Sequence, residues 1–312
     1  MNPFFNNKEN RARAGVRIPV YIFFSYLVLS VGNSIPLNGF EYVLTALMSL
    51  GIFWILFKVM DNRGSIKQAG ISINKKWFAE FGLGSAIGLG AMSLIFFSEW
   101  TAGDLKIIGF GWEGNGHAFW ALPVVMFFVQ MLCLGFYEEL ISRSYLITNF
   151  KEGFTNTKIN PTKATLGAIL ASSIVFGLLH VANPNATIFA LINILFAGVM
   201  LAIPYVVSGR LSYSVGLHFS WNFFQGGIFG FRVSGIPIRN SVIDIQQGGN
   251  HIWTGGSFGP EGGLIGLVLI LLISVFFLVY FKMNLGKIDI HPIFKRTYLQ
   301  NNETFTKTDE LA

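Results

Sequence analysis

At residues 136–143 the chain reads Phe-Tyr-Glu-Glu-Leu-Ile-Ser-Arg, which places three charged side chains inside a long apolar run. A charged side chain near the centre of a bilayer costs about 2.5–3.5 kcal/mol on insertion scales. Glu138, Glu139 and Arg143 are therefore expected to gain something in packing or in function that offsets this cost. We interpret the rest of the chain as the scaffold and the partners of these three side chains.

Composition predicts a membrane protein built from helices. Of the 312 residues, 52% are hydrophobic and only 12% are charged, which is about half the charged share of soluble domains. The expected fold class is all-α, a polytopic membrane bundle of about eight transmembrane helices. The net charge of +6 lies in loops and tails, so it indicates contact with lipid headgroups and no nucleic acid partner. The single cysteine, Cys133, excludes an internal disulfide and a Cys-rich metal site.

Apolar stretches long enough to span a bilayer occur at about residues 18–37, 40–60, 78–98, 118–149, 164–181, 186–207, 211–231 and 262–282. We expect a single membrane domain over 1–312, with a transmembrane core at 18–282, a cytoplasmic polar loop at 61–77 and a polar tail at 283–312. The tail is expected to be disordered beyond Leu299. The Gly-rich stretch 233–263 is too polar to span, and we expect an ordered external cap or re-entrant loop there, with a flexible loop as the alternative.

Two further patterns concern packing and orientation. Gly84-x-x-x-Gly88 in the third span forms a small-residue face suited to close helix packing. The N-terminus, the loops 61–77 and 150–163, Arg210 and the C-terminal tail are basic, and they share one side if the number of spans is even. The positive-inside rule then predicts a multi-pass protein of the cell membrane with both termini in the cytoplasm.

Helical spacing divides the charged stretch into two parts. Glu139 and Arg143 are four residues apart, so on a helix they share a face and can pair. Glu138 lies about 100° around the helix, where Ser142, and not a cation, follows four residues later. We therefore interpret Glu138 as the available acid/base group and Glu139 with Arg143 as its support. The alternative is that both carboxylates cap a span at headgroup level while Arg143 extends to the surface.

Two later spans also carry polar side chains at helical spacing. Phe176 and His180 share a face of the fifth span, and His218 and Asn222 share a face of the seventh. Hydrogen bonds between helices are the simpler interpretation of either pair alone. Together with Glu138, however, these residues could hold a water, remove its proton and stabilise an oxyanion at a carbonyl. If the fourth helix runs unbroken over 118–149, a length of roughly 48 Å, Glu138 lies only a few residues past its middle. The fifth helix must then tilt or start deep for His180 to reach the depth of Glu138.

Glu-Glu-x-x-x-Arg, Phe-x-x-x-His and His-x-x-x-Asn, in this order on successive helices, resemble the CPBP (ABI) family of intramembrane proteases. That family includes type II CAAX prenyl endopeptidases, and Gly255-Gly-Ser-Phe-Gly-Pro-Glu261 resembles its bacterial branch. The resemblance implies that Glu138 is the general base, that His180 helps to activate the water, and that His218 and Asn222 bind the oxyanion. Glu139, Arg143 and Phe176 would be supporting residues. The chain has Ser142-Arg-Ser144 where family members often have Phe-Arg-Gly.

The expected function is an intramembrane endopeptidase that cuts a peptide or a lipidated peptide near the cytoplasmic face of the lipid bilayer. No cofactor is expected: a zinc site built from one Glu, two His and an Asn is possible, but zinc prefers three firm protein ligands and a His-Glu-x-x-His sequence is absent. A non-proteolytic binding or bacteriocin-immunity protein of the same fold is the first alternative. A proton-coupled transporter that uses the same carboxylates is the second.

Overall fold

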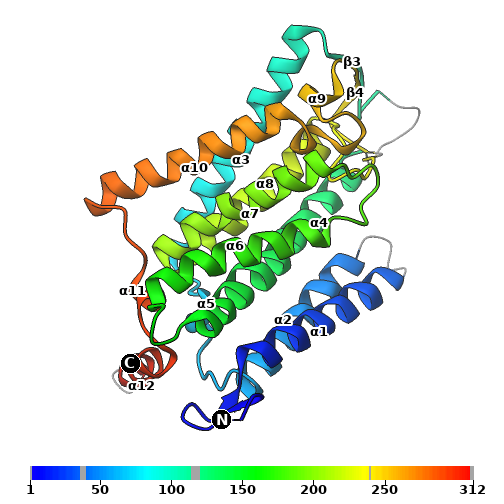
Figure 1. The fold of residues 1–312 in the computed structure, drawn as a ribbon. Coiled ribbons are helices and arrows are strands. Elements are labelled where there is room, and N and C mark those ends of the chain that lie inside the picture. Colours follow the sequence, from blue (N-terminus) through cyan, green and yellow to red (C-terminus); the bar gives the residue numbers. More distant parts are fainter. Residues whose placement is uncertain (1, 36–39, 114–119, 239, 310–312) are drawn as a thin grey trace.

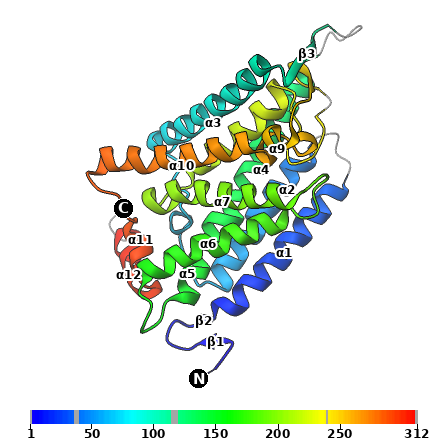
Figure 2. The same cartoon turned by 45° about the horizontal axis from the view of Figure 1, so that its top comes forward.

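A computed structural model describes residues 2–35, 40–113, 120–238 and 240–309. In this part of the chain, seven helices are long and apolar enough to cross a membrane. They are α1 (Ala14–Ser34), α2 (Glu41–Val59), α3 (Lys75–Ala102), α4 (Ala121–Glu139) with its continuation, α6 (Pro161–Leu179), α7 (Ile188–Ser208) and α10 (Leu264–Leu285). The predicted all-α membrane bundle is confirmed. Figure 1 shows α3 and α10 on one side of the bundle and α1 with α2 on the other; Figure 2 shows the same order, with α6 and α7 between them.

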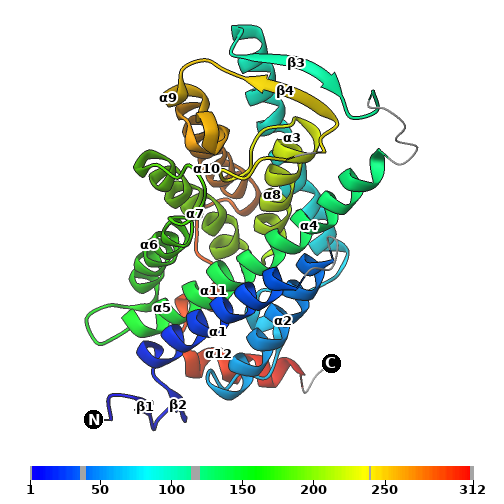
Figure 3. The ribbon, with the colours of Figure 1, turned by 90° about the vertical axis from the view of Figure 1, so that its right-hand side faces the viewer.

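The seventh expected span, 211–231, has an unexpected form. It is an 11-residue helix, α8 (Ser212–Asn222), which continues as a π-helix over Phe223–Ile228. All 11 residues of α8 are buried, so the helix runs through the interior of the bundle (Figure 3). Its polar residues make it less apolar than the seven lipid-facing helices, and burial among them removes the need for an apolar surface.

Glycines bring α3 and α8 into close contact, as the Gly84-x-x-x-Gly88 pattern predicted. A Cβ atom at Gly84 would lie 2.3 Å from the carbonyl oxygen of Tyr213, and one at Gly88 would lie 2.0 Å from the hydroxyl of Ser220. Gly216 of α8 allows the same close approach from the other side, because a Cβ atom there would lie 2.2 Å from the carbonyl oxygen of Phe81 in α3. The two backbones therefore touch along this face, and α8 is held at a fixed depth.

The fourth span is one continuous helical run, as the sequence predicted. It passes from α4 through a π-helix at Leu140–Ile147 into α5 (Thr148–Phe154). All eight residues of the π-helix are buried. A π-helix has more residues per turn than an α-helix and is frequent at functional sites; here it begins directly after Glu139.

A buried ionic network joins both ends of the chain. Glu152 accepts hydrogen bonds from Arg11 at 2.8 Å, from Arg17 at 3.0 Å and from Arg63. Lys151 donates to the carbonyl oxygens of residues 293 and 296. The C-terminal segment is thus packed on the bundle as α11 (Pro292–Lys295) and α12 (Tyr298–Asp309), so the expectation of a disordered tail beyond Leu299 is wrong for the described residues.

The opposite end of the bundle carries the smaller elements. Strand β3 (Leu105–Phe110) pairs antiparallel with β4 (Ile243–Gln247), and α9 (His251–Thr254) with two 3-10 turns, Gly256–Phe258 and Pro260–Gly262, follows. The N-terminal pair β1 (Phe5–Asn6) and β2 (Arg11–Ala12), with α12, lies at the other end (Figure 3). In the described residues the Gly-rich stretch is an ordered cap, and Arg239 lies outside them.

Candidate active site

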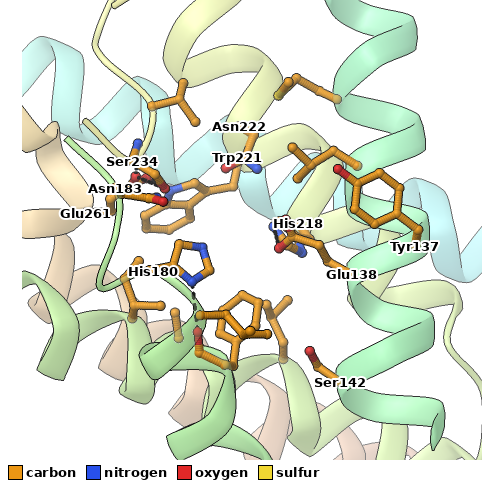
Figure 4. Close-up of a pocket in the computed structure, with 18 of the residues that line it drawn as sticks. Tyr137, Glu138, Ser142, His180, Asn183, His218, Trp221, Asn222, Ser234 and Glu261 are labelled. Carbon is orange, nitrogen blue, oxygen red and sulfur yellow. Dashed lines mark hydrogen bonds and ion pairs between the residues drawn. The ribbon is translucent and has the colours of Figure 1, made fainter. Parts of the chain in front are cut away.

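A cavity of about 470 Å³ lies inside the bundle, and all four expected catalytic residues line it: Glu138, His180, His218 and Asn222. Figure 4 shows Glu138 and His218 on one wall and His180 facing them. His180 and Glu138 therefore lie close enough in depth to line one cavity, as a shared active site requires. The remaining lining is mainly apolar, with side chains from α1, α2, α4, α6, α7 and α8. Its volume is that of an ordinary small-ligand or peptide-segment site.

The two adjacent glutamates have different environments. The Glu138 side chain is 23% exposed, and its Oε2 atom has no hydrogen-bond partner within the described chain. The Glu139 side chain is 0% exposed and faces the interior. Of the two glutamates, only Glu138 lines the cavity.

Glu139 and Arg143 form the ion pair that their spacing predicted, with Oε2 and Nε 3.1 Å apart. Neither atom meets hydrogen-bond geometry in the described structure. The π-helix explains this offset, because four residues complete less than one turn there. Arg143 instead stacks on Phe176, with its guanidinium carbon 4.4 Å from the ring centre. A desolvated cation over an aromatic ring is stabilised by about 2 kcal/mol.

His218 connects both carboxylates, a contact that sequence spacing did not predict. Its Nδ1 atom lies 2.9 Å from Oε1 of Glu139, and its Nε2 atom lies 3.8 Å from Oε2 of Glu138. A carboxylate can only accept, so Nδ1 carries the proton that is donated to Glu139. In the neutral ring Nε2 is then an acceptor that points toward Glu138 and the cavity. When Nε2 also carries a proton, the ring can donate to a group in the cavity.

His180 is oriented by the residue one turn before it. Its Nδ1 atom lies 2.8 Å from the carbonyl oxygen of Phe176, so Nδ1 must donate and Nε2 remains an acceptor. The two rings meet edge to face with centroids 4.9 Å apart, as the Phe-x-x-x-His spacing predicted. Phe176 therefore contacts His180 on one side and Arg143 on another, and its ring centre lies 6.0 Å from that of His218.

The outer wall of the cavity contains residues that we did not single out from the sequence: Asn183, Trp221, Ser234 and Glu261. Glu261 is only 3% exposed. It accepts hydrogen bonds from the backbone N–H of Ser234, from the Ser234 hydroxyl at 2.8 Å and from Nε1 of Trp221 at 3.3 Å. The signal in the sequence was Glu261 at the end of the Gly-rich stretch, but its partners are 27 and 40 residues away.

The described residues offer little to a metal ion. No group of three His, Cys, Asp or Glu side chains in this part of the chain could hold one. Asn222 is the fourth polar group of the cavity, and an amide is a poor ligand for zinc. The expectation that no cofactor takes part stays a prediction.

The cavity lies away from the basic end of the molecule. Its lining includes Asn183, which follows α6, and residues of the stretch 233–238. The network of Arg11 and Lys151 involves the segments near the two termini, which lie at the other end of the bundle (Figure 1). If the basic end lies in the cytoplasm, as expected, this placement favours cleavage away from the cytoplasmic face; the orientation and the side of cleavage stay predictions. Glu138 itself lies near the middle of the run Ala121–Phe154.

The fold and cavity define a polytopic membrane protein with a polar site inside its helices. A family profile described as "Type II CAAX prenyl endopeptidase Rce1-like" matches residues 120–224, a range that contains all three motifs. The match covers about a third of the chain, and this part resembles the CAAX-protease (CPBP) family of intramembrane proteases, as the motifs predicted; the match does not single out the bacterial branch. No curated protein matches the chain.

Proposed function

We propose that the protein is an intramembrane endopeptidase in which Glu138 activates the attacking water. The observation that carries this proposal is the partly exposed Glu138 side chain, whose Oε2 atom makes no hydrogen bond within the described chain, in a cavity shared with two histidines and an asparagine. In the proposed reaction the carboxylate takes a proton from water while the water oxygen attacks the peptide carbonyl. The protonated Glu138 then returns that proton to the leaving nitrogen as the C–N bond breaks.

His180 helps to hold the water. Its Nδ1–H is engaged by the Phe176 carbonyl, so its Nε2 lone pair is available to accept a hydrogen bond from the water. Two acceptors, Glu138 and His180, then orient both O–H bonds and leave a lone pair of the oxygen directed at the substrate. Pre-alignment of this kind lowers the entropic part of the barrier.

Asn222 and His218 stabilise the oxyanion. The Asn222 carboxamide supplies an N–H donor, and His218 supplies a second one when its Nε2 atom is protonated. Glu139 keeps the His218 ring in place through the 2.9 Å contact to Nδ1. Arg143 balances the charge of Glu139, and Phe176 packs under both the guanidinium and His180.

The substrate is a peptide or a lipidated peptide that lies in the membrane, because the cavity lining is mainly apolar and the spans are exposed to lipid. We keep the orientation that the basic residues favour, with both termini in the cytoplasm of a cell-membrane protein. The rim loops then face outward. Cleavage accordingly takes place in the outer half of the bilayer.

The test is a cleavage assay on the purified protein with prenylated and unprenylated peptides. Glu138→Gln should lower the rate by about 10²–10⁴-fold, the range for loss of a general base. Glu303→Gln, the same change on an exposed position of α12, is the matched control and should retain the rate. Metal analysis accompanies the assay, and treatment with a chelator should leave the rate unchanged.

Three outcomes would contradict this proposal. Cleavage by Glu138→Gln at the wild-type rate would remove the glutamate mechanism. Loss of activity on chelation, restored by zinc, would replace it with a metal mechanism. Protection or partner binding that survives Glu138→Gln, with no cleavage by the wild type, would favour the immunity alternative.

A further inference from the structure

The cavity has two polar walls, and the proposed mechanism uses only one of them and the histidine that faces it. The outer wall carries Asn183, Ser234 and Glu261, which lie together beyond His180 and across from Glu138 (Figure 4). A peptide that places its carbonyl carbon near Glu138 must extend past one of the two walls. The question is which group on the outer wall can bind it.

Glu261 and Ser234 are already engaged with each other. The Glu261 carboxylate accepts the backbone N–H and the hydroxyl of Ser234, and its other oxygen accepts the indole N–H of Trp221. Within the described residues, its partners are neutral donors. Asn193 fastens the same loop to α7 by donating to the carbonyl oxygens of Glu261 at 3.0 Å and Gly263 at 2.9 Å. This part of the wall is therefore a rigid support with little remaining hydrogen-bonding capacity.

Asn183 differs, because its carboxamide has no hydrogen-bond partner among the described residues while its backbone is held on both sides. Its N–H donates to the carbonyl oxygen of His180 at 3.1 Å, and its carbonyl oxygen accepts the N–H of Ala186 at 3.3 Å. The side chain lines the cavity and is half-buried. A carboxamide offers one acceptor and two N–H donors, which complements the C=O and N–H of a peptide group.

The loop of Asn183 is also fixed from outside. The carbonyl oxygen of Pro184 lies only 1.8 Å from the position that a Cβ atom of Gly235 would occupy. Gly235 has φ +84° and donates its N–H to Phe258 at 2.7 Å. The loop that bears Asn183 thus rests directly on the Gly235 turn, next to Ser234 and its partner Glu261. Because its backbone is already held in place, this loop needs no ordering when a ligand binds.

We propose that Asn183 binds a main-chain peptide group of the substrate, next to the bond that is cut, and that Glu261 is the positioning residue of this subsite. The inference rests on the proposed peptidase function and adds a binding residue that lies outside the three motifs. Asn183 Oδ1 accepts the N–H of one substrate amide, and its Nδ2 donates to a substrate carbonyl. The subsite recognises the peptide backbone, so it is indifferent to the substrate side chains.

The test measures peptide binding in the Glu138→Gln background, in which the substrate is not consumed. The probes are a dansylated peptide with a farnesylated C-terminal Cys-a-a-X sequence and its unprenylated Ser analogue. Each backbone amide near the cleavage site is replaced in turn by an ester, which removes one N–H donor and keeps the shape. We expect one ester position to weaken binding by about tenfold, which corresponds to the loss of one hydrogen bond.

The variants at residue 183 decide whether Asn183 is that partner. In Asn183→Leu the sensitive ester position should lose its effect, while Asn183→Asp keeps an acceptor oxygen and should retain it. Asn185→Gly, an exposed position of the same loop with φ +59°, is the control and should behave as the parent. Glu261→Gln should weaken binding of every peptide to a similar degree, because it loosens the wall and removes no contact to the substrate.

The outcomes separate the two proposals. If the ester pattern in Asn183→Leu equals that of the parent, the subsite is wrong while the peptidase function stands. If neither the wild type nor Glu138→Gln binds either peptide, both proposals fall. If Asn183→Leu does not fold, judged by its thermal unfolding, the comparison of Asn183→Asp with the parent carries the test: loss of the ester effect in the Asp variant overturns the subsite.

Discussion

Replacing Glu139 by Gln should destabilise the protein far more than the same change at Glu138. Glu139 is fully buried, lies 3.1 Å from Nε of Arg143 and accepts a hydrogen bond from His218 at 2.9 Å. Removal of one partner of a buried ion pair leaves the other charge uncompensated and costs about 3–5 kcal/mol. Glu138 is 23% exposed with an unpartnered oxygen, so Glu138→Gln should change the free energy of unfolding by less than about 1 kcal/mol.

The measurement is equilibrium unfolding of the purified protein in mixed micelles, titrated with a denaturing detergent and followed by tryptophan fluorescence. Stability is the right measure because both variants are expected to lose cleavage, so activity cannot separate support from chemistry. A second change sharpens the assignment. Arg143→Met in the Glu139→Gln background removes the uncompensated cation, and the double variant should recover part of the loss, with a coupling of about 0.5–3 kcal/mol.

Two results would refute this reasoning. Equal destabilisation by the two Gln variants would mean that Glu138 is as firmly paired as Glu139. Strict additivity of Glu139→Gln and Arg143→Met would mean that their 3.1 Å contact has no energetic weight. Either result would contradict the assignment of Glu139 as the supporting carboxylate and Glu138 as the available one.

Two further predictions concern the ends of the molecule. In a Cys133→Ser background, a membrane-impermeant maleimide added to intact cells should label Ser257→Cys, an exposed position of the Gly-rich cap, but not Lys287→Cys beside the basic end; the reverse pattern would invert the orientation. His291 Nδ1 accepts the N–H of Ile293 at the start of α11, and burial together with Arg210 and Arg296 lowers its pKa. This stability is present above the unfolded pKa of about 6.5 and is lost as the pH falls through the folded pKa, so thermal stability should decrease below about pH 6. His291→Asn, which can still cap the helix, should flatten that decrease, and an unchanged pH profile would contradict the prediction.

Most of the bundle could be predicted from the sequence, because each lipid-facing helix is encoded by a continuous run of apolar residues. The length of α8 was not predicted, because a helix that is buried on all sides does not need a continuous apolar surface. Such a helix can carry His218 and Asn222 without exposing them to lipid. The C-terminal tail was predicted to be disordered. Lys151 and Arg11 hold that tail through backbone carbonyls and the ring of Tyr298, contacts between segments that no local pattern encodes.

The candidate site was predictable within each helix and not between helices. Spacing of four residues correctly paired Glu139 with Arg143 and Phe176 with His180. The contact of His218 with Glu139 joins two helices 79 residues apart in the chain, and spacing cannot tell which helices are neighbours. The outer wall was missed for the same reason, because Glu261 meets Ser234 and Trp221 only in the folded protein.

Both π-helices begin directly after site residues, at Leu140 behind Glu139 and at Phe223 behind Asn222. A π-helix rotates the following residues relative to α-helical periodicity. On the fourth span Glu138 lines the cavity and Glu139 contacts His218 of α8, while Leu140, Leu146 and Ile147, all 0% exposed, pack into the core. In an unbroken α-helix, the residues that follow Glu139 would be rotated to other positions around the helix axis. The irregular turns therefore confine the polar groups to one short level of the bundle, where the cost of burying each is shared with the others.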